Sequence, residues 1–258
     1  MVYNSLNLLQ SKIFQINKER KEKMKNLFKG LLLGTLSMAA LALCAEDKTV
    51  LNLNFENGFD SDPYEFGKRG TAALVDEEGQ GKVLKVVADG KKGPAGIVLR
   101  GETAPEMTAE AFTWSFKFKY TGKPMSELPK GTYAWLMDCR YRGKDAKGGM
   151  SVNLSANAKD ANVTVTIGYK DGKSGSFRFR VPGAVDGKWH AVSIAVTPGK
   201  IAFTFDGKVQ NRVMQGVPAP ATQRLTIGDC VGSSYSPFYG LMDDIKLTVP
   251  AAAAPAAK

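Results

Sequence analysis

The sequence contains one histidine, His190, and this limits the catalytic chemistry that the chain could perform. A serine or cysteine nucleophile needs a base that is itself oriented by a third group. No other signal for such a triad accompanies His190, and a single histidine is too few for a His-rich metal centre. We therefore expect His190 to lie on a strand and to have a structural role.

Paired carboxylates are the second possible source of chemistry. A retaining glycosidase needs two carboxyl groups about 5–5.5 Å apart across the scissile bond. Two spaced sets stand out in the sequence: Glu102, Glu106 and Glu110, and Asp60 and Asp62. Pro105 interrupts the first set, and the second lies in a loop-like stretch. Neither set places two carboxylates on one regular face, so we expect no catalytic activity.

Basic side chains alternate on three segments, and alternation places both members of a pair on one face of a strand. The pairs are Lys117 and Lys119, Arg140 and Arg142, and Arg178 and Arg180. If the three strands share one sheet, these side chains form one cationic surface, which Asp138 would neutralise only in part. Arginine binds carboxylate and sulfate oxygens with paired donors, so this surface predicts an acidic glycan as ligand. The alternative is an ordinary solvated sheet face.

Two cysteines, Cys139 and Cys230, follow the N-terminal region. In an oxidising compartment they could form a disulfide between two strands, and the alternative is a pair of buried thiols. The sequence has no CxxC or CxxH spacing, so nothing supports a zinc site.

Residues 1–45 have the pattern of a secretory signal region. Basic residues precede an apolar run, 30–43, which is too short to span a bilayer, and small residues up to Ala45 suit cleavage. Met24 is a natural start for such a peptide, and lipidation of Cys44 is the alternative fate of the segment. We predict a secreted, periplasmic or cell-surface protein whose mature form has no transmembrane anchor.

The charge that remains after export is modest. The chain has a net charge of +10, but residues 46–258 contain 28 basic and 23 acidic residues, a net charge of +5. No run of basic residues is present, so the sequence gives no argument for a nucleic-acid partner. The last residues, 250–258, are rich in Ala and Pro and predict a flexible tail.

Segments rich in β-branched and aromatic residues, separated by Gly, Pro and Asp, fill the region after residue 46. The clearest is 111–120, AFTWSFKFKY, which alternates aromatic and polar residues as a half-buried strand does. Tyr133, Trp135 and Tyr141 alternate on the face opposite to Arg140, and we expect them to be largely core. We predict an all-β fold in one domain, 46–249: a two-sheet antiparallel β-sandwich.

The most informative segment is 186–208, DGKWHAVSIAVTPGKIAFTFDGK. Trp189-His190 opens one strand of this hairpin, and Asp206-Gly207 ends the next. Together with LTIG at 225–228 and FYGLMDDIKLT at 238–248, the segment resembles the concanavalin A-like, laminin-G-like family. The resemblance covers most of 50–249 and implies a jelly roll in which Trp189 packs inside the sandwich. It does not fix a ligand, because a fold does not imply a function.

The same resemblance implies a structural Ca²⁺, because many relatives hold this ion between the last strand and the end of the first. Candidate ligands are Asp243 or Asp244 with Glu56, Asn57 and nearby carbonyls, since calcium prefers several oxygen ligands. The alternative is a hydrogen-bonded aspartate that closes a turn.

The predicted function follows from export, the sandwich and the missing carboxylate pair. We predict a non-catalytic binding module, for carbohydrate or for adhesion, whose partner is a polysaccharide or a cell-surface glycan or protein. The alternatives are a glycoside hydrolase or lyase of the jelly-roll type with degenerate motifs, and a structural envelope protein.

Overall fold

The structure is a computed structural model that describes residues 47–86, 95–101, 107, 109–122, 133–140, 148–156, 161–221, 223–230 and 238–251. All of them lie in the second of the two units into which the chain divides, Glu46–Lys258. The predicted signal region with Met24 and Cys44, and residues 252–258 of the predicted tail, lie outside the described residues. Within the described residues, no helix is long and apolar enough to cross a membrane.

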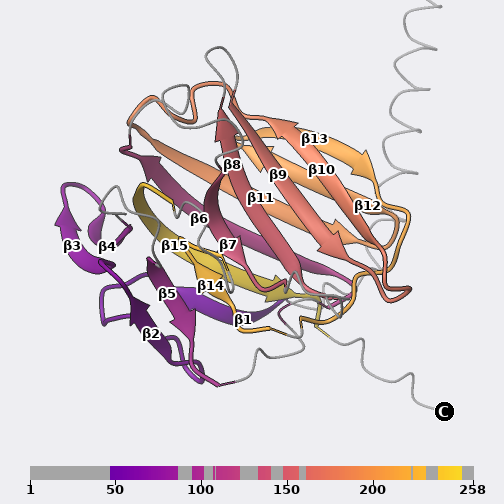
Figure 1. The fold of residues 1–258 in the computed structure, drawn as a ribbon, viewed down its shortest axis with the longest axis horizontal. Coiled ribbons are helices and arrows are strands. Elements are labelled where there is room, and N and C mark those ends of the chain that lie inside the picture. Colours follow the sequence, from indigo (N-terminus) through magenta and orange to yellow (C-terminus); the bar gives the residue numbers. More distant parts are fainter. Residues whose placement is uncertain are drawn as a thin grey trace, which may run out of the picture. The chain divides into compact units, whose positions relative to one another are not determined.

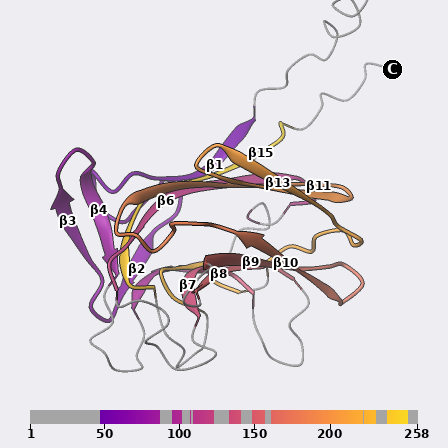
Figure 2. The ribbon, with the colours of Figure 1, turned by 90° about the horizontal axis from the view of Figure 1, so that it is seen from above.

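Two antiparallel sheets form the domain, so the predicted two-sheet sandwich is confirmed (Figures 1 and 2). The strands of the eight-stranded sheet are β1 (Lys48–Leu53), β3 (Ala73–Glu77), β4 (Gly81–Val86), β6 (Phe112–Tyr120), β11 (Trp189–Thr197), β12 (Lys200–Phe205), β13 (Lys208–Val213) and β15 (Gly240–Val249). Their order is β13-β12-β11-β6-β15-β4-β3, and β1 also pairs with β15.

The second sheet has seven strands and lies nearer to the viewer in Figure 1. Its strands are β2 (Phe66–Arg69), β5 (Gly96–Leu99), β7 (Ala134–Asp138), β8 (Met150–Ala156), β9 (Ala161–Gly168), β10 (Ser174–Arg180) and β14 (Thr226–Ile227). They follow the order β10-β9-β8-β7-β14-β5-β2. One face of this sheet therefore packs on the other sheet, and the opposite face, its outer face, points away from the sandwich core.

Alternating side chains fill the space between the sheets. Along β6, Trp114, Phe116 and Phe118 are buried while the polar residues between them are partly exposed, which confirms the alternation seen in the sequence. Val163 and Val165 of β9 enter the same core from the other sheet. This burial of large apolar side chains from both sheets is what holds the sandwich together.

The predicted hairpin at 186–208 is present, and a further strand follows it. Thr197 pairs with Lys200 across a two-residue turn, and Asp206-Gly207 links β12 to β13 with φ angles of 46° and 77°. Positive φ at both central residues suits the right-handed twist of a hairpin. The sequence did not predict β13, because both of its faces are largely exposed and its residues show no apolar alternation.

The prediction that Trp189 packs inside the sandwich is wrong. Trp189 pairs with Lys119 and His190 pairs with Phe118, and directly opposed residues share a face. The inward positions of β11 are therefore His190, Val192 and the residues that alternate with them, and Trp189 is only half-buried, on the outer side. His190 takes the inward place that the resemblance gave to the tryptophan.

A β-bulge in β7 decides which of its side chains face outward. Trp135 pairs with Asn153 of β8, but the register shifts before Met137, which pairs with Val152. An inserted residue reverses the alternation beyond it. Trp135 and Asp138 consequently share the outer face although they are three residues apart.

Candidate functional site

The outer face of the seven-stranded sheet carries a row of side chains in register across four strands. Trp135 pairs with Asn153, Asn153 with Thr164, and Thr164 with Arg178. We call these four residues the cavity row. The residues that flank them on β8 and β9, such as Val152 and Val163, are buried in the sandwich core, so the row projects away from it.

A cavity of about 200 Å³ lies over this row, and Tyr133 completes its lining. Tyr133 is 40% exposed, whereas Trp135 is 1% exposed. Tyr133 is therefore partly open to a ligand, and Trp135 forms part of the cavity wall. The prediction that both would be core is wrong for Tyr133; Trp135 is buried, but it faces outward and lies outside the main hydrophobic cluster.

Asn153 gives the cavity an unsatisfied polar atom. Its side chain is 7% exposed, and its Oδ1 atom has no hydrogen-bond partner within the described part of the chain. A buried acceptor that lacks a partner costs about 1–3 kcal/mol. Asn153 also lines the cavity, so its amide group is a candidate hydrogen-bonding partner for a hydroxyl group of a ligand.

A second row of polar residues lies beside the first. It consists of Thr226, Asp138, Ser151, Thr166 and Ser176, and we call it the hydroxyl row. The Oγ atoms of Thr166 and Ser176 are 2.9 Å apart, and Asp138 accepts the backbone N–H of Arg140 at 3.0 Å. Thr226, Asp138 and Ser151 are buried, whereas Thr166 is half-buried and Ser176 is exposed, so only the β9 and β10 end of this row is open.

The structure does not place the predicted basic pairs on one surface. Arg178 and Arg180 lie on β10, and Arg140 follows β7 of the same sheet, but Lys117 and Lys119 lie on β6 of the other sheet. Arg142 and Tyr141 lie outside the described residues. The single cationic face is therefore wrong, because alternation fixes the face of a strand but not the sheet to which the strand belongs.

Both lysines of β6 have acidic partners. The Nζ atom of Lys117 is 2.7 Å from Asp244 Oδ2, and that of Lys119 is 2.6 Å from Glu77 Oε1. The bond to Asp244 raises the pKa of Lys117. These side chains form ion pairs within the domain rather than a surface that awaits an anionic ligand.

Two of the predicted calcium ligands, Asp243 and Asp244, lie at a bulge of β15. The register shifts between Asp243 and Lys246, and Asp244 has a φ of 49°. Asp243 is buried, with a pKa raised to about 6 chiefly by desolvation and also by the charges of Asp244 and Glu56. Glu56 instead accepts the backbone N–H of Lys82 at 3.1 Å.

These residues do not fit a calcium ion. Lys117 already supplies a cation to Asp244, and Asn57 is exposed. The described residues contain no group of three or more His, Cys, Asp or Glu side chains placed to hold a metal. The ammonium group of Lys117 instead places a positive charge beside Asp244.

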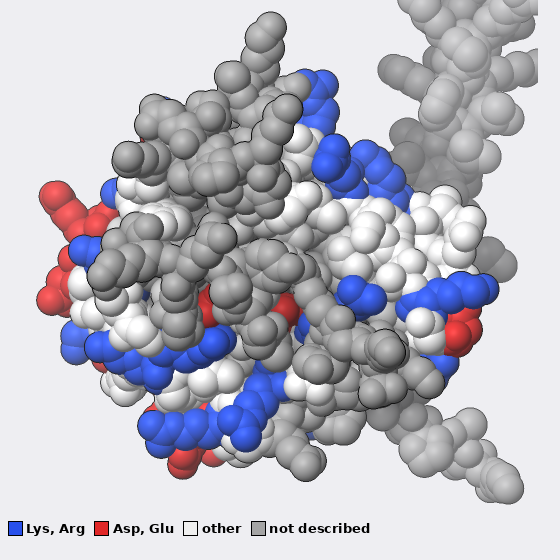
Figure 3. Space-filling model, in the orientation of Figure 1, with Lys and Arg blue, Asp and Glu red and all other residues white. Residues whose placement is uncertain are grey.

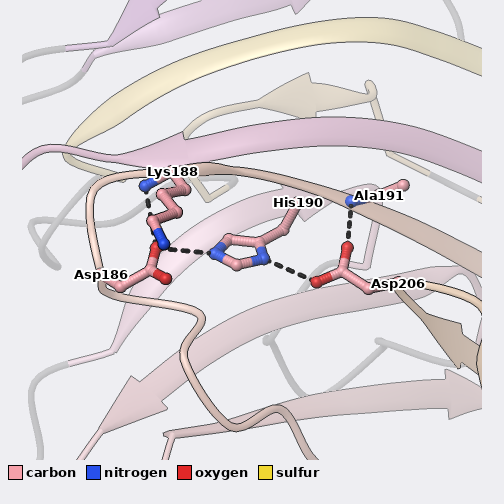
Figure 4. Close-up of polar contacts among 5 residues, drawn as sticks. All are labelled: Asp186, Lys188, His190, Ala191 and Asp206. Atoms are coloured by element: carbon pink, nitrogen blue, oxygen red, sulfur yellow. Dashed lines mark hydrogen bonds and ion pairs between the residues drawn. The ribbon is translucent and has the colours of Figure 1, made fainter.

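His190 lies between two carboxylates at the start of β11 (Figure 4). Its Nδ1 atom is 2.8 Å from Asp206 Oδ2, and its Nε2 atom is 3.0 Å from Asp186 Oδ1. Asp186 also accepts the backbone N–H of Lys188, which lowers the pKa of the carboxyl group. The imidazole ring stacks on Phe205 with 5.0 Å between ring centroids. These contacts tie a loop to a hairpin turn, as a structural histidine does.

The remaining predicted positions have structural environments. Cys139 and Cys230 are buried thiols that are not joined in a disulfide, so the alternative of two thiols holds. Burial raises the pKa of Cys139 to about 12, which makes it a poor nucleophile. Asp60 accepts the backbone N–H of Phe66, and Glu110 forms an ion pair with Lys170. Glu102 and Glu106 lie outside the described residues.

No family model matches this sequence, and no curated protein matches it. The fold is similar to domain 4 of AbnA, an extracellular arabinanase from Geobacillus stearothermophilus solved with arabinotriose: TM-score 0.52, 16% identity, 80% of this chain and 94% of that one. It is also similar to a carbohydrate esterase of Shiga toxin-encoding bacteriophage phi24B: TM-score 0.52, 18% identity, 79% of this chain and 99% of that one. A third similar structure is the enzymatically active domain of tailspike protein 2 from bacteriophage CBA120: TM-score 0.51, 15% identity, 76% of this chain and 30% of that one.

At these identities the similarities establish the fold alone. They agree with the β-sandwich that the concanavalin A-like resemblance implies, and membership of that family stays a prediction.

Sequence reasoning missed Tyr133, Asn153 and Thr164 as site residues. A signal was present, since the polar residues of SVNLS and NVTVT alternate with apolar ones. That alternation shows which residues face outward on each strand. It does not show that Asn153 and Thr164 are opposite each other and next to Arg178, because pairing partners and register are tertiary properties.

Proposed function

We propose that the domain is a non-catalytic carbohydrate-binding module that holds a glycan against the outer face of its seven-stranded sheet. The observation that carries the proposal is the cavity over the cavity row, with a buried Asn153 Oδ1 atom that lacks a partner among the described residues. Sugar hydroxyls are donors of the kind that this acceptor requires.

The chemistry of the lining supports a sugar ligand. Tyr133 presents an exposed aromatic ring, which can stack on the apolar face of a sugar ring. Asn153 and Thr164 offer hydrogen-bonding groups to hydroxyls, and Thr166 and Ser176 of the hydroxyl row add two accessible hydroxyl groups on β9 and β10. A few polar groups placed around an aromatic side chain are typical of small-ligand sites.

The lining also favours binding over hydrolysis. The described residues that surround the cavity include neither Asp nor Glu, and a glycosidase of the common type needs two carboxyl groups there. The nearest acid on these strands, Asp138, is fully buried. Secretion or display at the cell surface remains part of the proposal and rests on the N-terminal sequence pattern alone.

A polysaccharide array tests the proposal, with a reducing-end assay on the same samples. The native domain and a Val213→Ala control, altered at an 80% exposed position of the other sheet, should retain glycan and release no product. Tyr133→Ala should lose retention, because the ring that stacks on the sugar is gone. Release of reducing ends would contradict the non-catalytic assignment, and a native domain that retains no glycan would contradict carbohydrate binding.

A further inference from the structure

Among the described residues that line the cavity, Arg178 alone is charged. It lies at the β10 end of the cavity row, whereas Trp135 on β7 and Tyr133 just before β7 lie at the other end, and the Arg178 side chain is exposed. Within the described part of the chain, the structure gives its guanidinium group no ion pair, in contrast to Lys117 and Lys119. An exposed guanidinium at a cavity is available to a ligand.

The charge around Arg178 is positive. Strands β7 to β10 carry one acidic residue, Asp138, which is fully buried, while Arg178 and Arg180 are exposed on β10. Arg212 of β13 reaches the same edge, where its guanidinium donates to the backbone carbonyl of Arg178 at 3.4 Å. In Figure 3, Lys and Arg atoms lie on both halves of this face, and Asp or Glu atoms lie beside those at its right edge.

The positions of Tyr133 and Arg178 suit different parts of one ligand. Three strand spacings separate β7 from β10, which amounts to about 14 Å. A sugar ring that stacks on Tyr133 would leave the next part of a short saccharide near Asn153 and Thr164. Arg178 would then meet a substituent farther along the same chain.

On the proposed function, we infer that the glycan carries an anionic group, a carboxylate or a sulfate, and that Arg178 binds this group. The guanidinium presents paired N–H donors in a plane, which match two oxygens of either group. The exposed arginines around it add attraction at longer range. Arg178 is thus the specificity-determining residue of the site, and Tyr133 and Asn153 bind the sugar itself.

The experiment compares ligands that differ in charge. Calorimetric titrations would use oligogalacturonate against its fully methyl-esterified form, and dextran sulfate against dextran. We expect the native domain to bind at least one anionic probe about tenfold more tightly than its neutral counterpart, the factor that one charge-assisted hydrogen bond provides. This preference should fall as ionic strength rises, because salt screens exposed charges. The two pairs of probes distinguish a carboxylate from a sulfate.

The variant Arg178→Gln should lose the preference, because its affinity for the anionic probe should fall about tenfold. Lys246→Gln is the matched control, since it removes one exposed positive charge from the other sheet, and it should retain the preference. An Arg178→Gln variant that keeps the preference, or a native domain that binds charged and neutral probes equally, overturns the inference and leaves the proposed function intact. A native domain that binds no probe, and no glycan on the array, overturns the proposed function itself.

Discussion

The two sheets share a sequence pattern on their outer faces, in which basic residues alternate with aromatic ones, but the basic side chains have different neighbours. On β6, Lys117 and Lys119 alternate with core aromatics, and each forms an ion pair with an acid from another strand. On β10, Arg178 alternates with Phe177 and Phe179 in the same way, but strands β7 to β10 contain a single acid, the buried Asp138. A basic side chain on such a face is a candidate ligand-binding residue where no acid from another strand pairs with it, as for Arg178 within the described residues.

Charge reversal tests this difference most strongly. Lys117→Glu would place another carboxylate beside Asp243 and Asp244, and we expect the free energy of unfolding to fall by about 2 kcal/mol, between the effects of exposed and buried ion pairs. Arg178→Glu breaks no ion pair and should change it by less than about 0.5 kcal/mol. Urea denaturation of both variants measures the contrast. An equal fall in the free energy of unfolding for both variants would contradict the difference in ion pairing between the two faces.

The pH dependence of stability sharpens the comparison on the β6 side. Burial raises the pKa of Asp243 to about 6 from a usual value of 3.8. Between these values the folded state binds more protons than the unfolded state, so this residue lowers stability as the pH rises from about 4 to 6. Above that window its unfavourable contribution is fully present.

Asp243→Asn should therefore have a higher free energy of unfolding than the native domain at pH 8. At pH 4 this difference between the two proteins should be much smaller. Urea denaturation at the two pH values gives the difference directly. Asp244→Asn is a useful comparison, because Asp244 is half-exposed and is paired with Lys117. A difference between Asp243→Asn and the native domain that does not vary with pH would contradict the buried, unfavourable state of this carboxyl group.

A smaller effect is expected where the two sheets meet at β10 and β13. The amide group of Gln210 accepts the backbone N–H of Arg180 at 3.3 Å and donates to its carbonyl at 2.7 Å, so it covers the open edge of β10 as a strand partner would. Gln210→Ala should lower the free energy of unfolding by about 1 kcal/mol and speed hydrogen exchange at the Arg180 amide. Asn211→Ala, one position along the same exposed strand, is the control and should leave that amide protected.

The smallest effect is expected from calcium. A ligand raises the stability of a protein only if it binds the folded state, and Lys117 already provides the cation at Asp244. Millimolar Ca²⁺ should therefore leave the melting temperature of the native domain unchanged. A calcium-dependent rise that EDTA reverses would restore the metal site at Asp243, Asp244, Glu56 and Asn57 that the sequence suggests.

The amino-acid sequence predicted most of the strands, because alternation of apolar and polar residues marks a strand that has one buried face; β13 has none and was missed. It predicted the alternation of β6, the hairpin from β11 to β12, and the outward positions of Arg178 and Arg180 on β10. Each of these follows from local pattern alone. For Cys139 and Cys230 the sequence left a disulfide and two buried thiols open, and the structure has two buried thiols.

The sequence could not predict which strands lie side by side, because this depends on the tertiary structure. Alternation cannot tell that β6 and β10 belong to different sheets, so it joined lysines and arginines that the fold separates. It also cannot reveal the extra residue in β7, which turns Trp135 outward in register with Asn153, nor the pairing that places His190 rather than Trp189 on the inner face. Register and sheet membership depend on hydrogen bonds between segments far apart in the chain, and a one-residue shift reverses every face beyond it.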